Sequence, residues 1–278
     1  KNFCKFNNSK YGIGVGSGTD ALFIALKVLN IGKGDEVITV SNTAIPTVAA
    51  IKNTGAEVKF IDIGKDYLID VKKIKQAINS KTKAIIPVHL FGQTCNMNEI
   101  ISISKKYNLK IIEDCAEAHG VEYKGKKVGS IGDIGVFSFF ANKTITCGEG
   151  GMIVTNSKEL AEKAKSLKNL SYGKVNKFIH DDIGFNYRLS NISAALGLGQ
   201  FTNIDKIFLE KERIYEKYKK NLKNVKGVRI PLIKEWTTKY IMWVFNIYLD
   251  NNFPLTRDQL VKMLEKKNIE TRNAYVPI

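Results

Sequence analysis

The sequence predicts an α/β fold in which helices flank a mainly parallel or mixed sheet, followed by a small C-terminal α+β domain. Over the first two thirds of the chain, short runs rich in isoleucine and valine alternate with segments of helical spacing, as expected for repeated strand–helix units. The alternation then stops, and a long, highly charged helical pattern replaces it. A length of 278 residues suits one large domain with a small appendage. We place the two domains at 1–200 and 201–278.

The individual elements follow from this alternation. Strands are expected where short apolar runs end in polar or small residues, and helices where helical spacing ends near Asn or Gly. The predicted strands are 35–40, 57–63, 83–90, 110–116, 134–140 and 151–156, and the predicted helices between the first of them are 18–30, 44–55, 70–78 and 97–108. Further along we expect a helical stretch at 190–227, a strand at 242–250 and a helix at 256–268 that Thr256 caps.

The net charge of +16 raises the question whether the partner is nucleic acid or an anionic membrane. Lysine far outnumbers arginine, the basic residues are spread over the whole chain, and no basic run is interleaved with aromatic residues. This pattern is typical of a lysine-rich proteome, so we expect neither of these partners. Small anionic substrates would still be attracted by the positive field.

The four cysteines, Cys4, Cys95, Cys115 and Cys147, form no CxxC pair. We therefore expect reduced thiols and no metal site. No signal peptide opens the chain and no apolar run reaches the ~18 residues of a membrane span, which predicts a cytoplasmic protein. Residue 1 is not methionine and the chain stops after AYVPI, so we also expect a trimmed chain.

The glycine-rich segment GIGVGSGTDAL (12–22) suggests two kinds of site. It is a poor dinucleotide-binding fingerprint, because Thr19 stands where the third glycine is required and the acidic residues that follow precede a strand. A phosphate site fits better, since Gly18 and Thr19 open a helix whose free N–H groups attract anions. A glycine turn that merely enters a helix remains the alternative.

Two carboxylates in IIEDCAEAHG, Glu113 and Asp114, lie at the C-terminal end of a predicted buried strand. Ligand groups gather at this edge in open α/β sheets. A buried carboxylate requires a cationic partner or several donors. A helix cap or a structural ion pair explains the same pattern, and His119 is equally consistent with a hydrogen-bonded turn histidine.

Lys143 is the only cation in FSFFANKTITCGEGG, between an apolar strand and a glycine turn. A lysine in such a place is poorly hydrated, so its pKa is lowered and its amine becomes a nucleophile that can form a Schiff base. Pyridoxal phosphate requires a Schiff-base lysine, a carboxylate for its pyridinium nitrogen, a phosphate cradle and a ring-stacking wall. The first three occur in the order cradle, carboxylate, lysine, which is the order in fold-type I aminotransferases.

The motifs together resemble those of the DegT/DnrJ/EryC1/StrS sugar aminotransferase family. The resemblance covers nearly the whole chain and is carried by SGTDALFIAL, GDEVITVSNTAIPTVAAI, PVHLFGQTCNM, the block from 111 to 156, and GFNYRLSNISAALGLGQ. The block from 111 to 156 is the most specific. The resemblance implies a fold-type I fold that depends on pyridoxal 5′-phosphate.

The resemblance also implies a role for individual residues. Lys143 would carry the cofactor as a Schiff base and move the proton during transfer, and Asp114 would hold the pyridinium proton. Backbone N–H groups of Gly18 and Thr19 and the hydroxyl of Ser138 would bind the phosphate. Two further residues are implied in the same way. Glu117 would contact the phenolic oxygen of the cofactor, and Asn186 would reach the phosphate from the neighbouring subunit of a homodimer.

Two features depart from the pattern of the family. Many members carry an aromatic ring that stacks on the cofactor where this chain has Ala44, so another side chain is expected to cover the ring or the stack is weaker. Members also usually carry further residues before residue 1 and after residue 278, which help to shape the dimer and the sugar pocket.

The expected function is transfer of an amino group from L-glutamate to a nucleotide-linked keto-deoxysugar by a ping-pong route, for polysaccharide, lipopolysaccharide O-antigen or glycan synthesis. ANKTITCGEGGM and NYRLSN resemble members that aminate C4 of 4-keto-6-deoxy sugars, such as perosamine synthases, whereas SNTAIPTVAAI and PVHLFGQTCNM resemble members that aminate C3. We favour C4. The alternatives are C3 amination, a sugar dehydrase, which Lys143 disfavours, and a decayed member that acts as a binding or regulatory protein.

Overall fold

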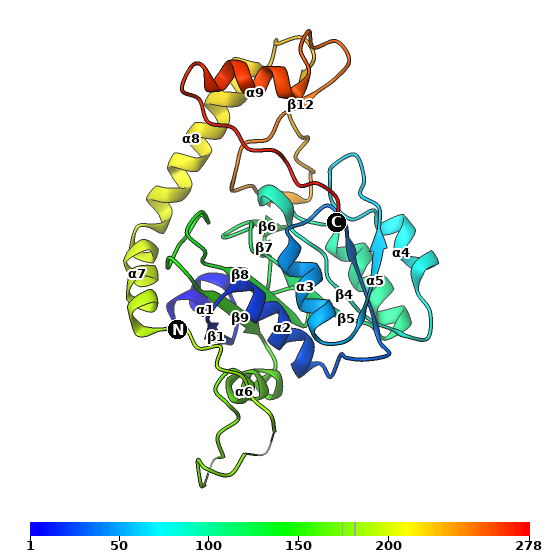
Figure 1. Ribbon diagram of the computed structural model, residues 1–278, viewed down its shortest axis with the longest axis vertical. Coiled ribbons are helices and arrows are strands. Elements are labelled where there is room, and N and C mark those ends of the chain that lie inside the picture. Colours follow the sequence, from blue (N-terminus) through cyan, green and yellow to red (C-terminus); the bar gives the residue numbers. More distant parts are fainter. Residues whose placement is uncertain (174, 181) are drawn as a thin grey trace.

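A seven-stranded sheet forms the centre of the molecule in the computed structural model, which describes residues 1–173, 175–180 and 182–278 (Figure 1). The strand order is β1-β9-β8-β5-β4-β2-β3, and every neighbouring pair from β8 to β3 is parallel. Strand β9 runs antiparallel to both β1 and β8. The strands are Tyr11–Val15 (β1), Glu36–Val40 (β2), Glu57–Ile61 (β3), Thr82–Ile85 (β4), Lys110–Asp114 (β5), Ile134–Ser138 (β8) and Gly151–Thr155 (β9). The predicted mixed, mainly parallel sheet is confirmed.

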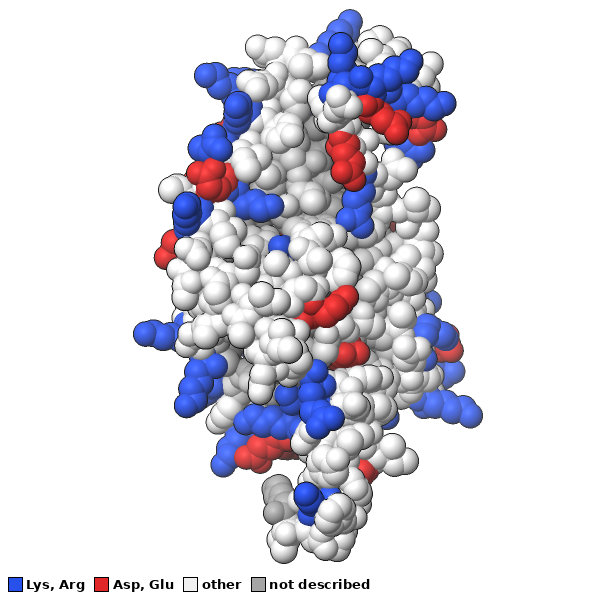
Figure 2. Space-filling view, turned by 60° about the vertical axis from the view of Figure 1, so that its left-hand side comes forward, with Lys and Arg blue, Asp and Glu red and all other residues white. Residues whose placement is uncertain are grey.

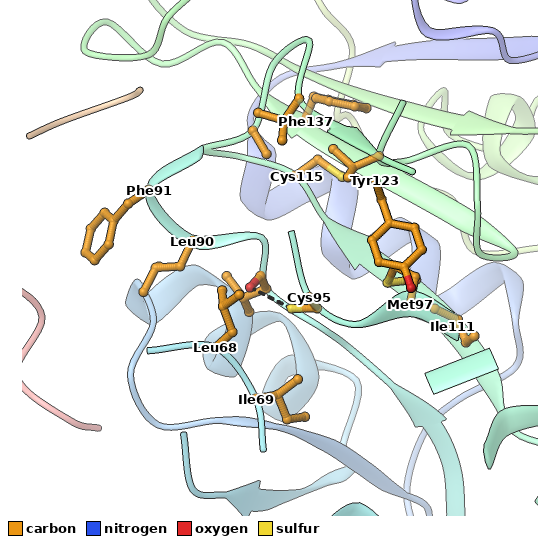
Figure 3. Packing of buried hydrophobic residues seen from close by; sticks show 14 of the residues in the cluster. Leu68, Ile69, Leu90, Phe91, Cys95, Met97, Ile111, Cys115, Tyr123 and Phe137 are labelled. Carbon is orange, nitrogen blue, oxygen red and sulfur yellow. Dashed lines mark hydrogen bonds between the residues drawn. The ribbon is translucent and has the colours of Figure 1, made fainter. Parts of the chain in front are cut away.

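Helices cover both faces of the sheet and bury two separate apolar clusters. One cluster packs α2 (Gly18–Val28), α3 (Ile45–Asn53) and α6 (Lys158–Leu167) against one face. The other packs α1 (Asn2–Asn7), α4 (Val71–Ala77), α5 (Met97–Tyr107) and the start of α8 (Ile204–Leu222) against the opposite face. Figure 3 shows part of this second cluster, with Phe91 of the 3-10 turn η1 (Leu90–Gly92) at its edge.

The remaining elements are small or project from this body. They are β6 (Glu122–Tyr123), β7 (Lys126–Lys127), α7 (Asn191–Thr202), β10 (Val228–Arg229), β11 (Thr237–Lys239), β12 (Tyr248–Leu249) and α9 (Arg257–Glu265). Helices α7 and α8 run along one side toward the C-terminal part, and the chain then returns so that its end lies beside the sheet (Figure 1). The division into domains at residue 200 stays a prediction.

One predicted element is wrong, and one strand was not predicted. The expected strand at 242–250 is regular only at β12, because the apolar residues Met242 and Trp243 are buried against the rest of the protein rather than paired in a sheet. The helical stretch predicted at 190–227 is confirmed, as two helices that meet at Asn203. Strand β1 was not predicted, and its residues 12–15 belong to the glycine-rich segment 12–22. Gly12 allows the close approach of Cys4, because an added Cβ would lie 2.4 Å from the Cys4 Sγ.

The surface charge is dispersed. On the face shown in Figure 2, most lysines and arginines lie in separate groups toward the two ends and along the sides, and the largely uncharged surface between them carries acidic groups near its centre. Among the described helices, none combines the length and the apolar composition needed to cross a bilayer.

Candidate active site

Asp114 ends strand β5 at the carboxyl edge of the sheet and is 3% exposed. Its carboxylate accepts hydrogen bonds from the Thr47 hydroxyl (2.8 Å) and from the Ala116 N–H (3.1 Å). Within the described ranges, no lysine or arginine forms an ion pair with it. Burial raises the pKa of Asp114 above its ordinary value, against the lowering effects of the Ala116 and Thr47 donors and of the Lys143 charge. Such a carboxylate is suited to a cationic ligand.

Lys143 lies in the turn after β8, where its N–H donates to the Phe140 carbonyl (2.9 Å). Its side chain is 10% exposed, and its Nζ lies 3.8 Å from Glu117 Oε1 and 4.0 Å from the centroid of the Trp243 ring. Burial lowers the pKa of this amine, while the charges of Glu117 and Asp114 raise it and that of Arg272 lowers it further. The structure therefore places the lone lysine of the glycine turn in the buried environment that the sequence predicts, near Asp114.

Gly18, Thr19 and Ser138 meet where the first turn of α2 faces the end of β8. Ser17 caps the helix by accepting from the Asp20 N–H (3.0 Å), and the first N–H groups of a helix have no helical partners. A Cβ added to Gly18 would lie 2.8 Å from the Ser138 Cβ. Only glycine allows this contact, so the helix terminus and the serine hydroxyl can line one small anion site.

Glu117 is 4% exposed and is held from two sides. Oε2 accepts from the Phe91 N–H (3.0 Å), and Oε1 accepts from the Tyr275 hydroxyl (2.5 Å). Burial raises the pKa of Glu117, and the Lys143 charge is the largest opposing effect. The predicted site residues Asp114, Glu117 and Lys143 thus belong to one buried, charged group.

Asn186 does not join this group within one chain. It is exposed, pairs with Asn169 across a β-bridge, and accepts from Arg188 Nε (2.9 Å). The segment that carries it runs beside the start of α2, since the Gly16 N–H donates to the Tyr187 carbonyl (3.1 Å). This location is compatible with the predicted role in a neighbouring subunit, which stays a prediction.

Glu113 is a structural residue, as the alternative interpretation of IIEDCAEAHG proposed. It accepts from the N–H groups of Gly129, Ile131 and Gly132 at 2.6–2.9 Å and faces His89 Nε2 at 3.1 Å. A ligand atom of Cys115 lies within 4.8 Å of those of His89 and Glu113, but both Glu113 oxygens are already engaged by these donors. The pair therefore braces the turn that leads into β8.

His119 differs from the hydrogen-bonded turn histidine that the sequence suggested. Its ring is buried among Phe137 and Phe139, and neither ring nitrogen has a hydrogen-bond partner among the described residues. Burial is the main cause that lowers the pKa of His119 to about 3, so the ring is neutral.

Four residues of the site were missed by sequence reasoning: Thr47, Phe91, Trp243 and Tyr275. Thr47 stands one turn into α3, three residues after Ala44, which caps that helix and carries no ring. Phe91 has a positive φ of 56°, which is strained for a bulky residue and directs its N–H at Glu117. Backbone strain at Phe91 leaves no local signal in the sequence. Thr47 and Phe91 nevertheless lie in SNTAIPT and LFG, two segments of the family motifs, so a comparison of these motifs residue by residue could have found them.

The comparisons with known proteins agree with this geometry. The profile of the DegT/DnrJ/EryC1/StrS aminotransferase family matches residues 1–278. The chain belongs to this family. It is 42% identical to a protein named GDP-perosamine synthase of Escherichia coli O157:H7 over 277 residues, which are 99% of the chain and 75% of the relative.

A second relative and a solved structure of the family bear on the substrate and the fold. The chain is 43% identical, over 226 residues, to dTDP-3-amino-3,6-dideoxy-alpha-D-galactopyranose transaminase of Aneurinibacillus thermoaerophilus, covering 81% of the chain and 62% of the relative. The crystal structure of DesV from S. venezuelae superposes with a TM-score of 0.92 at 33% identity, covering 99% of this chain and 73% of that one. The protein is therefore a sugar aminotransferase of fold-type I.

Members of this family depend on pyridoxal 5′-phosphate, and the residues present fit that cofactor. The buried Asp114 carboxylate has two donors and, among the residues that the structure describes, no ion pair, which suits a cationic ring nitrogen. Lys143 supplies a buried amine at the same edge. The close approach of Gly18 to Ser138, where an added Cβ would lie 2.8 Å from the Ser138 Cβ, places the first turn of α2 and the serine hydroxyl where they would suit a phosphate.

Proposed function

We propose that this chain transfers the amino group of L-glutamate to C4 of a nucleotide-linked 4-keto-6-deoxyhexose. The observation that carries the proposal is that a buried carboxylate with no ion-pair partner among the described residues, Asp114, and a largely buried amine, Lys143, lie at one edge of the sheet. The 42% identity to a GDP-perosamine synthase supports the choice of sugar. Pyridoxal phosphate supplies the electron sink on which transamination depends.

The residues of the chain are assigned separate tasks. Asp114 would keep the ring nitrogen protonated, because a carboxylate at that place stabilises the cation. Lys143 would bind the cofactor through its amine and, once released, would move the proton at the amino-bearing carbon. The N–H groups of Gly18 and Thr19 and the hydroxyl of Ser138 would hold the phosphate, and Glu117 would face the phenolic oxygen.

The position of Thr47 supports C4 over C3. The segment that resembles C3-aminating members, SNTAIPTVAAI, contacts the site through Thr47, which donates to Asp114 (2.8 Å). It therefore borders the carboxylate proposed for the ring nitrogen, and that nitrogen lies opposite the reacting position of the pyridine ring. The turn of Lys143, which resembles C4-aminating members, is closer to the chemistry. For this reason we give the resemblance of the Lys143 turn to C4-aminating members more weight than the resemblance of SNTAIPTVAAI to C3-aminating members.

Amination of C3 is the second candidate. It is favoured by the 43% identity to a relative named as a 3-amino-3,6-dideoxy sugar transaminase, which is as high as the identity to the perosamine synthase but spans 226 residues instead of 277. Identity alone does not separate the two substrates.

The test supplies a 4-keto-6-deoxyhexose nucleotide and its 3-keto isomer separately, with glutamate, and locates the amine by NMR. We expect an amine at C4 from the first substrate and none from the second. Product from the 3-keto isomer alone would reverse the assignment, and parallel reactions with GDP- and dTDP-linked sugars would identify the nucleotide.

The exposed surface near Asn186 supports a homodimer with a shared active site. Helix α7, which follows this residue, is largely apolar yet buries no side chain, and Ile192, Leu196 and Leu198 are 50–78% exposed. The loop before it also exposes Phe178 (78%) and Ile183 (84%). Apolar surface of this extent is typical of an interface. A second copy on this face would bring Asn186 to the phosphate cradle of its neighbour.

A further inference from the structure

The C-terminal end of the chain returns to the lysine site. In Figure 1 this segment runs back from α9 and ends beside the sheet. The Ile278 N–H donates to the Ser41 carbonyl (3.1 Å), and the Tyr275 hydroxyl donates to Glu117 Oε1. Neither the alternation of strands and helices nor the family motifs of the site predict this contact between residues that are 158 positions apart.

The two oxygens of Glu117 have different tasks. Oε2 is held by the strained Phe91 through its N–H (3.0 Å). Oε1 is the oxygen that faces Lys143 Nζ (3.8 Å), and it also accepts the Tyr275 hydroxyl (2.5 Å). Two donors from distant segments therefore fix the plane of the carboxylate, and the one from Tyr275 fixes the oxygen that faces the lysine.

We propose that Tyr275 is a positioning residue, whose hydroxyl holds Glu117 as the counter-charge of Lys143. The inference deepens the proposed function, because it concerns the lysine to which that function assigns the amine chemistry. Tyr275 itself stays a neutral donor, since burial and the neighbouring Glu117 raise its pKa. Its ring stacks on that of Phe91 (centroids 5.8 Å apart, 8° between planes), so the hydroxyl can be removed while the ring remains packed.

The charges that face this pair come from several elements. Lys143 is under the influence of Glu117 and Asp114, which favour the ammonium form, and of Arg272, which opposes it. Glu117 is influenced by Lys143 and Asp114 in opposite directions. On its other side the lysine lies over the indole of Trp243, whose Nε1 is bound to the Asn142 carbonyl (2.8 Å). Among the described residues, Glu117 Oε1 is the carboxylate oxygen that pairs with the amine, at 3.8 Å.

The expected consequence is a change in the charge of Lys143 when the hydroxyl is lost. Without Tyr275 as a donor, Glu117 loses one hydrogen bond to its charged form and is free to turn away from the lysine. The ammonium form of Lys143 then loses part of its stabilisation, so a larger fraction of the amine is neutral at a given pH. The pKa of Lys143 is expected to fall in Tyr275→Phe, and to fall further in Glu117→Gln, where the charge itself is removed.

The experiment measures the amine directly in the full chain freed of cofactor. Lys143 is methylated with formaldehyde and borohydride across a pH series, and the rate of modification of its peptide is followed by mass spectrometry. We expect the profile of Tyr275→Phe to move to lower pH. Tyr248→Phe is the matched control: its ring stacks on Tyr67 (3.9 Å), and within the part of the chain that the structure describes the tyrosine hydroxyl bound to Glu117 is that of Tyr275, so the profile of this variant should match that of the parent chain.

A double-mutant cycle distinguishes two roles of Tyr275: holding Glu117 in place, or shielding Lys143 from the reagent. If Tyr275 acts through Glu117, then Tyr275→Phe adds no shift in the Glu117→Gln background. A shift that persists there means that the tyrosine only shields the lysine, and it would overturn the proposal. Superimposable profiles for the parent and Tyr275→Phe, or an unshifted Glu117→Gln profile, would overturn it as well. Because no turnover is measured, a wrong substrate assignment leaves this result unaffected.

Discussion

Helices α2 and α7 have similar apolar composition but differ completely in burial. Helix α2 buries six of its residues, among them Leu22 and Ile24, against the sheet, and its first turn faces Ser138. Helix α7, NISAALGLGQFT, begins five residues after Asn186; none of its residues is fully buried, and Ser193, Gly197 and Phe201 are half-buried. An apolar helix gains stability by removing its surface from water, so we expect the exposed face of α7, with Ile192, Leu196 and Leu198, to find its partner outside this chain.

The difference separates the two halves of the proposed site. The half built on α2, β5 and β8 comes from one chain, with Asp114 and Ser138 buried and the Lys143 side chain only 10% exposed. The half that contains Asn186 is exposed and lies next to the unburied helix. We infer that the chain supplies one half to its own site and the other half to the site of a second copy.

The largest expected effect is in the complete half. Lys143→Ala should abolish both turnover and the covalent trapping of cofactor by borohydride, because no other amine replaces it. Lys127→Ala is the control, since burial also lowers the pKa of that partly buried lysine but its ion-pair partner is Glu122. Normal transamination by Lys143→Ala would show that the lysine has another role.

Asp114→Asn should keep the fold and lose roughly 10²–10⁴-fold in rate, the usual size of such electrostatic and acid–base effects. The amide cannot balance the charge of a protonated ring nitrogen. Steady-state kinetics and circular dichroism measure the two parts of the prediction. A rate near that of the parent chain would exclude Asp114 from the site.

Subunit exchange tests the division between the halves. Mixed dimers of Lys143→Ala and Asn186→Ala contain one site with both residues intact, so random exchange should make about a quarter of all sites functional. A mixture of Lys143→Ala with Asp114→Asn is the matched control, because both residues lie in the same half and no intact site can form. Equal activities of the two mixtures would contradict a shared site.

The two helices themselves allow a test by stability. Leu22→Ala in α2 should lower the free energy of unfolding by about 2–5 kcal/mol, the usual range for a buried leucine. Leu196→Ala in α7, at 58% exposure, should change it by no more than about 0.5 kcal/mol in a monomer. In a dimer its effect should grow and depend on protein concentration. Urea unfolding at two protein concentrations distinguishes these results.

The smallest expected effect is a pH shift from Thr47→Val. The Thr47 hydroxyl lowers the pKa of Asp114, so its loss raises that pKa and a higher pH is needed to keep the carboxylate charged. The affinity for pyridoxal phosphate, measured across a pH series, should therefore begin to fall at a higher pH in the variant than in the parent chain. Thr39→Val is the matched control, since that hydroxyl donates to the Ile86 carbonyl and not to Asp114. If the affinity of Thr47→Val fell at the same pH as that of the parent chain, the hydrogen bond from Thr47 would have no effect on the pKa of Asp114.

Much of the fold could be predicted because it depends on local pattern. Strand β5 and helix α5 begin within one residue of their predicted starts, because an apolar run or a helical repeat can be recognised in the sequence without knowledge of the tertiary contacts. The predicted strand at 242–250 failed because the apolar residues Met242 and Trp243 are buried by tertiary packing, and apolar character does not specify the partner.

The same contrast holds for the site. By itself the sequence determined that Lys143 follows an apolar strand and that Asp114 ends another. It also determined that both lie at a carboxyl edge of the sheet, because strand direction and side-chain type follow from the local sequence. Only the tertiary structure decided that Thr47 donates to Asp114 and that Tyr275 reaches Glu117. These pairs are 67 and 158 positions apart, and no periodic pattern joins residues whose proximity arises from packing.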